Sequence, residues 1–287
     1  MRFWYLIFYL VFLCGCQNEK VNEAGAEVFD SQVLEIENKI VKNQKNFENN
    51  DQGKRELLLL MANSVDYYSY LDGAMVLTTS YQGEARQIKY DFQIDVGNYH
   101  SYIYQIASNS INEQCYFRDN EKMYFLNGNV NELHNSDIDE LVNEKKMTVE
   151  LVDIDNSLNK YADLSLEERI ENLNTTRVAN DLYGDVAPYV FPEDIALYQL
   201  GLNYRNYQIK ENALYLNREV FVIEGIIDDS IYNEGDIYML VDKQTGILLK
   251  YKYTSDVSEV EMVMNRLEVD TSNNEDMYLK WIKKSEN

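Results

Sequence analysis

The sequence predicts an α+β protein in which a curled antiparallel β-sheet is covered on one face by helices. Two blocks of strand-like sequence, 73–128 and 206–269, are separated by a segment, about 136–201, with helical or irregular patterns, and a helix precedes the first block. The chain of 287 residues contains 24 Tyr but only 2 Pro, a composition that favours long strands. Helices in this layout cover the sheet face that water would otherwise reach.

The first fifteen residues have the layout of an export signal. An apolar run without charges, 3–13, follows Arg2 and precedes a polar stretch. A transmembrane helix needs about 20 apolar residues, so this run is too short to span a bilayer. We therefore predict a signal peptide at 1–15 and a flexible tether at 16–30.

The end of the signal and the residue after it read Leu13-Cys14-Gly15-Cys16. This sequence resembles the lipobox of bacterial lipoproteins, with Cys16 as the first mature residue. Cys14 does not fit, because Leu13 is too large for the position before the cleavage site. The resemblance implies that Cys16 carries a thioether-linked diacylglycerol and anchors the protein to the cell membrane on its extracytoplasmic side. The alternative is a secreted protein with a chance cysteine.

The N-terminal half begins with helices and continues with strands. Apolar residues recur at helical spacing in 33–41 and 54–68. In 88–96 every second residue is apolar, which predicts an antiparallel strand with one buried and one solvated face. A hairpin partner precedes it at 73–82, and further strands follow at 101–108, 113–118 and 122–128.

The middle segment and the C-terminal half have different patterns. In the middle, helices are expected at 136–144, at 165–173, where Ser165 and Glu168 form a capping-box signature, and at 189–202. Strands are expected at 206–216, 218–227, 236–242, 246–253 and 259–269. Neither strand block alone has an evident cover for its apolar face, so we predict a single domain over 31–280, with the helical insertion at about 136–201.

Charge and residue types exclude several functions. The net charge of −23 argues against nucleic acid and against binding to anionic lipid head groups through surface charge, so the acyl anchor must supply membrane attachment. Cys115 is the only thiol left once Cys16 is acylated, and we expect it to be buried and inert. The stretch 152–160 lacks the Gly and the Glu that a calcium loop requires, so we predict no calcium site there. No catalytic motif is found, so we predict no enzyme activity, metal or cofactor.

Four short motifs mark the C-terminal strands. They are Arg218-Glu219, Asp242-Lys243-Gln244-Thr245-Gly246, Leu249-Lys250-Tyr251 and Val269-Asp270. Their series resembles the closing strands of the outer-membrane lipoprotein carrier superfamily, which includes a lipoprotein carrier, its lipoprotein receptor and an envelope-stress sensor. The resemblance implies an incomplete barrel, a strongly curved open antiparallel sheet with helices in its concave face, which binds acyl chains or lipidated protein.

The resemblance also selects candidate ligand-binding residues. They are Tyr90, Phe92, Ile94, Met239 and Met262. Core packing beneath a helix explains such apolar stripes in most proteins, so the alternative is that these side chains are simply core. We expect a lipoprotein that holds or senses an acyl chain, lipid or lipopeptide, or, as the alternative, an interaction module that regulates a membrane-protein partner without a small ligand.

Overall fold

The computed structural model of the chain describes residues 47–108, 113–118, 121–128, 144, 146–151, 161, 163–172, 175–178, 183–229 and 233–270. The chain divides into two compact units, Met1–Glu35 and Ile36–Asn287, and every described residue belongs to the second. The predicted signal peptide, Cys16, the tether, the helix predicted at 33–41 and all but the last residue of the helix predicted at 136–144 lie outside the described residues.

Eleven strands form one antiparallel sheet in the order β6-β5-β4-β3-β2-β1-β11-β10-β9-β8-β7. The first block contains β1 (Tyr70–Tyr81), β2 (Glu84–Asp95), β3 (His100–Ala107), β4 (Glu113–Arg118), β5 (Lys122–Asn127) and β6 (Met147–Leu151). The second contains β7 (Tyr207–Tyr215), β8 (Arg218–Asp229), β9 (Asn233–Asp242), β10 (Leu248–Thr254) and β11 (Ser258–Val269). The first strand of the chain pairs with the last, which joins the two blocks.

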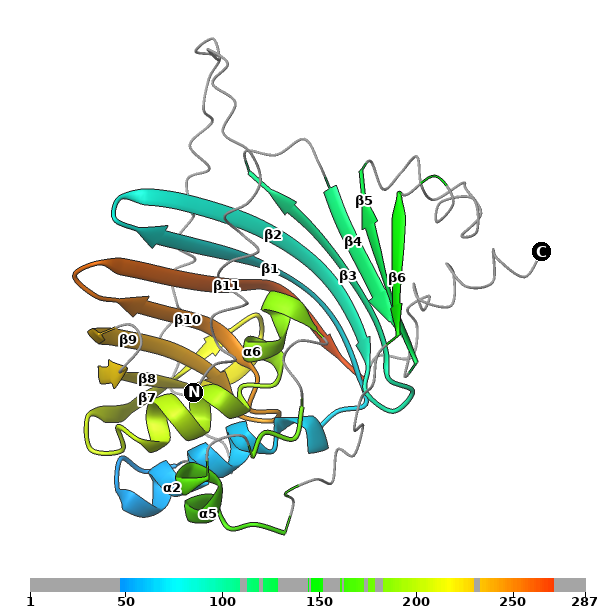
Figure 1. Cartoon of the computed structure of the whole chain (residues 1–287). Coiled ribbons are helices and arrows are strands. Elements are labelled where there is room, and N and C mark those ends of the chain that lie inside the picture. Colours follow the sequence, from blue (N-terminus) through cyan, green and yellow to red (C-terminus); the bar gives the residue numbers. More distant parts are fainter. Residues whose placement is uncertain are drawn as a thin grey trace. The chain divides into compact units, whose positions relative to one another are not determined.

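The sheet is open and strongly curved (Figure 1). Its outermost strands, β6 and β7, are at opposite ends of the order. The register shifts between Ala74 and Met75 in β1, between Ile209 and Asn212 in β7, and between Leu248 and Lys250 in β10. Bulges of this kind bend a strand and increase its twist, so they help the sheet to curl. The predicted α+β fold with a curved antiparallel sheet is therefore confirmed.

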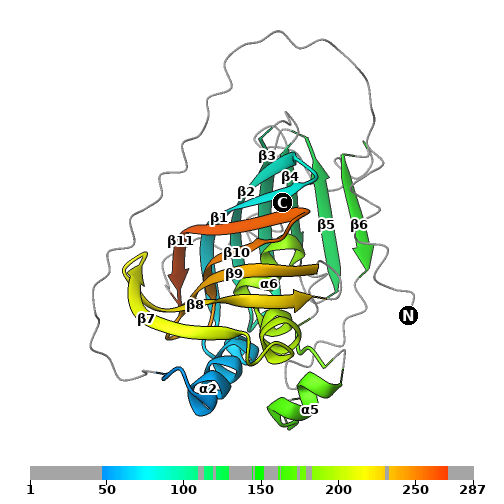
Figure 2. The same cartoon turned by 90° about the vertical axis from the view of Figure 1, so that its left-hand side faces the viewer.

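The helices lie on the concave side of the sheet, as predicted (Figures 1 and 2). They are α2 (Asp51–Ala62), a 3₁₀ turn η1 (Ser64–Asp66), α5 (Leu166–Glu171), a 3₁₀ turn η3 (Gly184–Val186), α6 (Ala187–Val190) and a π-helix η4 (Ile195–Gly201). Asn50 caps α2, since its side-chain oxygen accepts a hydrogen bond from the Gly53 amide at 2.9 Å. The predicted capping box of Ser165 and Glu168 is present at α5.

One strand was not predicted. β6 lies inside the segment 136–201, for which the sequence indicates helical or irregular structure, and pairs with β5. Four of its five residues are half-exposed or exposed, so the strand has no continuous apolar stripe that would reveal it. Pairing with a neighbouring strand, and not its own hydrophobic pattern, determines its conformation.

Candidate functional site

An apolar row crosses the concave face of the sheet. Cross-strand pairing places seven buried side chains side by side on seven neighbouring strands. From β2 to β7 they are Ile88, Leu77, Met262, Tyr251, Met239, Ile223 and Ile209. Adjacent strands lie about 4.8 Å apart, so the row is roughly 29 Å long before curvature is considered. We call these seven residues the apolar row.

The structure places the five predicted ligand-binding residues in two groups. Met239 and Met262 belong to the apolar row and flank Tyr251 there. Tyr90, Phe92 and Ile94 follow one another along β2 on the same concave face, beyond Ile88. All five side chains are buried in one hydrophobic core. Sequence reasoning did not select the other five residues of the row, although each lies on the buried, alternating face of its strand. They are Ile88, Leu77, Tyr251, Ile223 and Ile209.

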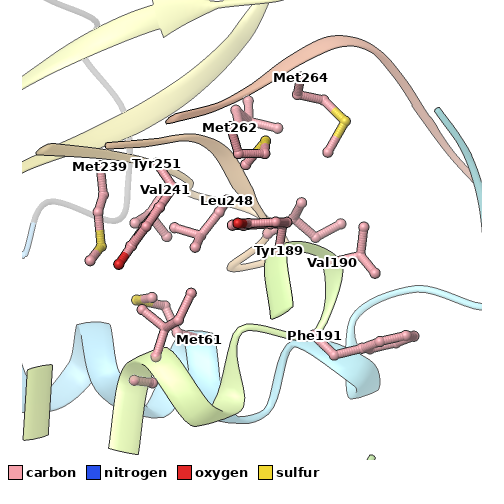
Figure 3. Close-up of a cluster of buried hydrophobic side chains, with 14 of the residues drawn as sticks. Met61, Tyr189, Val190, Phe191, Met239, Val241, Leu248, Tyr251, Met262 and Met264 are labelled. Atoms are coloured by element: carbon pink, nitrogen blue, oxygen red, sulfur yellow. The ribbon is translucent and has the colours of Figure 1, made fainter. Parts of the chain in front are cut away.

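A short segment of the chain covers this face. We call residues Tyr183–Gly201, which contain η3, α6 and η4, the lid. Figure 3 shows Tyr189 and Val190 of the lid on the side of the sheet that carries Met262 and Met264, with Phe191 farther from these methionines. The rings of Tyr189 and Tyr251 are 5.9 Å apart, and the hydroxyl of Tyr251 donates to the side-chain oxygen of Gln199 in η4 at 3.1 Å. Side chains of the chain itself therefore contact the apolar row.

A buried network of charges holds the lid. Glu193, which is 4% exposed, receives a hydrogen bond from the Arg169 guanidinium of α5 and one of 2.7 Å from the Arg177 amide. The guanidinium of Arg177 forms two 2.7 Å contacts with Asp66, next to the end of α2. Burial raises the pKa of Glu193 to about 7, against the opposing effect of Arg169. This network connects the lid to α5 and to the turn after α2.

The Asp-Lys-Gln-Thr-Gly motif has a structural role in the turn between β9 and β10. The buried carboxylate of Asp242 accepts hydrogen bonds from Arg218 at 2.9 and 3.0 Å. It also accepts from the amide and the hydroxyl of Thr245 at 2.9 and 2.6 Å. Gly246, at a φ of 77°, completes the turn with a 2.9 Å bond from its amide to the Asp242 carbonyl. Two of the four motifs thus meet in one arrangement that fixes β8 to β9.

Other chemistry is limited in the described structure. Cys115 is buried, and burial raises the pKa of its thiol to about 12, which makes it a poor nucleophile. Among the described residues no three His, Cys, Asp or Glu side chains are grouped as a metal site would require. Within the same residues no helix is long and apolar enough to cross a membrane.

Comparison with known proteins returns solved structures only. No family model and no curated protein matches the sequence. The structure of MucB matches at a TM-score of 0.41 and 10% identity, over 79% of this chain and 62% of MucB. This chain thus spans less than two thirds of the MucB structure.

Two further matches are named as lipoproteins or sorting domains. The lipoprotein LppX of Mycobacterium tuberculosis matches at a TM-score of 0.38 and 8% identity, over 79% of this chain and 100% of LppX. A putative outer membrane lipoprotein-sorting protein domain from Vibrio parahaemolyticus matches at 0.28 and 10% identity, over 82% of this chain and 100% of that domain. The function proposed below rests on this chain's own residues.

Proposed function

We propose that this chain is an extracytoplasmic lipoprotein, anchored to the cell membrane through Cys16, that binds an acyl chain along the apolar row and holds or senses it. The observation that carries the proposal is the apolar row itself, because seven consecutive strands contribute to it and Tyr251 is its one residue with a polar group. A linear apolar surface of this length suits a fatty acyl chain once the lid is displaced. No catalytic step is part of the proposed function.

The lid has features of a segment that can be displaced from the apolar row. α6 has four residues and η4 seven, and π-helical turns are rare and frequently occur at functional sites. Methionine side chains at Met61, Met239, Met262 and Met264 line the boundary between lid and sheet (Figure 3). Because methionine is unbranched and polarizable, such a surface adapts to lid side chains or to a lipid.

Two opposing free-energy terms govern the exchange of the lid for a lipid. In the closed form the apolar row contacts apolar lid side chains, and in the loaded form it would contact methylene groups. The row stays out of water in both forms, so the driving force is removal of the lipid from water, about 0.8 kcal/mol per CH₂. Exposure of lid side chains such as Tyr189 and Phe191 opposes this gain.

Native mass spectrometry tests lipid binding. The full chain with Cys16→Ser, which carries no acyl anchor, is expected to retain a co-purified lipid or to take up added palmitate. Met262→Gln places an amide in the apolar row and is expected to reduce uptake. Val263→Gln is the matched control, since Val263 is the next residue of β11 and points to the opposite face. A folded chain that takes up no lipid contradicts the proposal.

The anchor is tested separately by cell fractionation. Cys16→Ser is expected to release the protein from the membrane or to leave its signal uncleaved, whereas Cys14→Ser is expected to leave the protein anchored. Membrane retention with normal processing in Cys16→Ser would show the anchor assignment to be wrong. The alternative function, regulation of a membrane-protein partner, predicts one stoichiometric cross-linked partner whose capture is unchanged in Met262→Gln.

A further inference from the structure

A second, polar cluster lies beneath the lid, next to the apolar row. It consists of Tyr90 on β2, Ser101 on β3, and Tyr116 and Arg118 on β4, and we call it the donor cluster. Cross-strand pairing aligns Ser101 with Ile94 and with Arg118, so these side chains share the concave face. Tyr90, Ser101 and Arg118 are each 1% exposed. Tyr90 is two residues from Ile88, where the apolar row begins on β2.

The first residues of the lid contact three members of the donor cluster. The hydroxyl of Tyr90 donates to the Asp185 carboxylate at 2.5 Å. The Arg118 guanidinium lies over the Tyr183 ring, 4.8 Å from its centroid. Gly184 lies against Tyr116, and a Cβ at Gly184 would be 2.2 Å from the Tyr116 hydroxyl. The lid thus brings a carboxylate to the hydroxyl groups of the sheet.

The donor cluster is suited to bind an anion. Burial and the charge of Asp185 raise the pKa of Tyr90 and that of Tyr116, so both phenols keep their protons and can donate. The Ser101 hydroxyl is buried and has no hydrogen-bond partner among the described residues, which is costly for a polar group. Arg118 adds a permanent positive charge beside these hydroxyls.

We propose that the donor cluster binds the anionic headgroup of the lipid once Tyr183–Val186 moves off the sheet, and that Asp185 occupies this place in the closed form. The inference rests on the proposed function and specifies its ligand: a lipid with a single chain along the apolar row and a carboxylate or phosphate near Tyr90. The headgroup accepts the hydrogen bond that Tyr90 donates to Asp185 in the closed form. It also takes the place of the Tyr183 ring next to the Arg118 guanidinium. No covalent bond is made or broken.

Competition binding tests the inference. The full chain with Cys16→Ser is loaded with the neutral dye Nile red, which is then displaced with palmitate, methyl palmitate or palmitoyl lysophosphatidate. The ratio of the affinity for an anionic lipid to that for methyl palmitate is the anion preference. We expect a preference of about tenfold or more, since hydrogen bonds to a charged group are stronger than those to a neutral ester. Comparison of palmitate with lysophosphatidate distinguishes a carboxylate ligand from a phosphate ligand, and either result supports the proposal.

Variants of the donor cluster isolate its contribution. Tyr90→Phe and Tyr116→Phe each remove one hydroxyl and are expected to lower the anion preference about fivefold or more, with binding of methyl palmitate retained. Asp185→Asn removes the competing charge and is expected to raise the anion preference. Tyr207→Phe is the matched control, because it removes a buried hydroxyl on β7, outside the donor cluster.

Two results would overturn different statements. The headgroup site is wrong if the anion preference of the chain with an unchanged donor cluster is close to one. It is also wrong if Tyr90→Phe and Tyr116→Phe leave that preference unchanged. In both cases binding of the apolar chain would still stand. Displacement by none of the three lipids from a folded chain would instead overturn the proposed function. Circular dichroism of each variant establishes that the chain is folded.

Discussion

Glu193→Gln is expected to remove a pH dependence from the stability of the protein. The carboxyl group of Glu193 is 4% exposed, contacts the Arg169 guanidinium and accepts the Arg177 and Val178 amides at 2.7 and 3.4 Å. Burial raises its pKa to about 7 from the ordinary value of 4.5. The folded chain therefore binds more protons at this group than the unfolded chain does between pH 4.5 and 7.

The sign and the size of the effect follow from this difference. Because the folded pKa is raised, the protonated group favours the folded state, and this stability is lost as the pH rises through about 7. The free energy of unfolding falls by about 3 kcal/mol from this group between pH 4.5 and pH 8. Glutamine has a similar shape and does not titrate. Glu193→Gln therefore lacks the pH-dependent part of the unfolding free energy that comes from this group.

Urea unfolding followed by circular dichroism at pH 5, 6, 7 and 8 measures the effect. The difference in unfolding free energy between the parent and Glu193→Gln isolates the group, because the other carboxylates are the same in both chains. Glu168→Gln is the control: hydrogen bonds from Ser165 lower the pKa of Glu168, so its contribution is lost only as the pH falls below the range measured. A parent-minus-Glu193→Gln difference that is constant with pH would refute the reasoning.

Three further predictions concern the lid, the β9–β10 turn and the free thiol. Gly184→Ala places a Cβ 2.2 Å from the Tyr116 hydroxyl, at a residue whose φ is 53°. We expect this change to lower the free energy of unfolding by roughly 1–2 kcal/mol and to speed hydrogen exchange in the lid. Unchanged exchange would contradict this prediction. Asp242→Ala leaves the Arg218 guanidinium without its buried partner and should cost about 3–5 kcal/mol in urea unfolding, whereas a loss below 1 kcal/mol would argue against the role of this pair. Cys115, whose pKa burial raises to about 12, should resist iodoacetamide at pH 8 until the chain is unfolded, as peptide mass spectrometry would show, and rapid labelling of the folded chain would contradict its burial.

The elements that sequence reasoning predicted have local causes. The alternation in 88–96 reports the buried face of β2 directly, since successive side chains of a strand point to opposite faces. The capping box at Ser165 and the Asp242–Gly246 turn likewise depend on side chains that bond to backbone a few residues away. These features are present in the sequence because the interacting groups are close along the chain.

The features that sequence reasoning missed depend on distant residues. The pairing of β1 with β11 joins residues almost 200 positions apart, and it brings Leu77 next to Met262 in the apolar row. The contact of Tyr90 with Asp185 crosses 95 positions. Neither contact has a local signature, because each depends on where the curved sheet and the lid meet.

The sequence by itself determined all strands of the pattern except β6, the capping box at Ser165 and the turn at Asp242–Gly246, because these depend on neighbouring residues. The anchor at Cys16 stays a prediction. Only the tertiary structure decided that Met239 and Met262 share one row, that lid side chains contact it, and that Tyr90 faces a carboxylate of the lid. The physical reason is that β-sheet pairing and core packing join segments that are far apart in the chain, where periodicity gives no information on which segments meet.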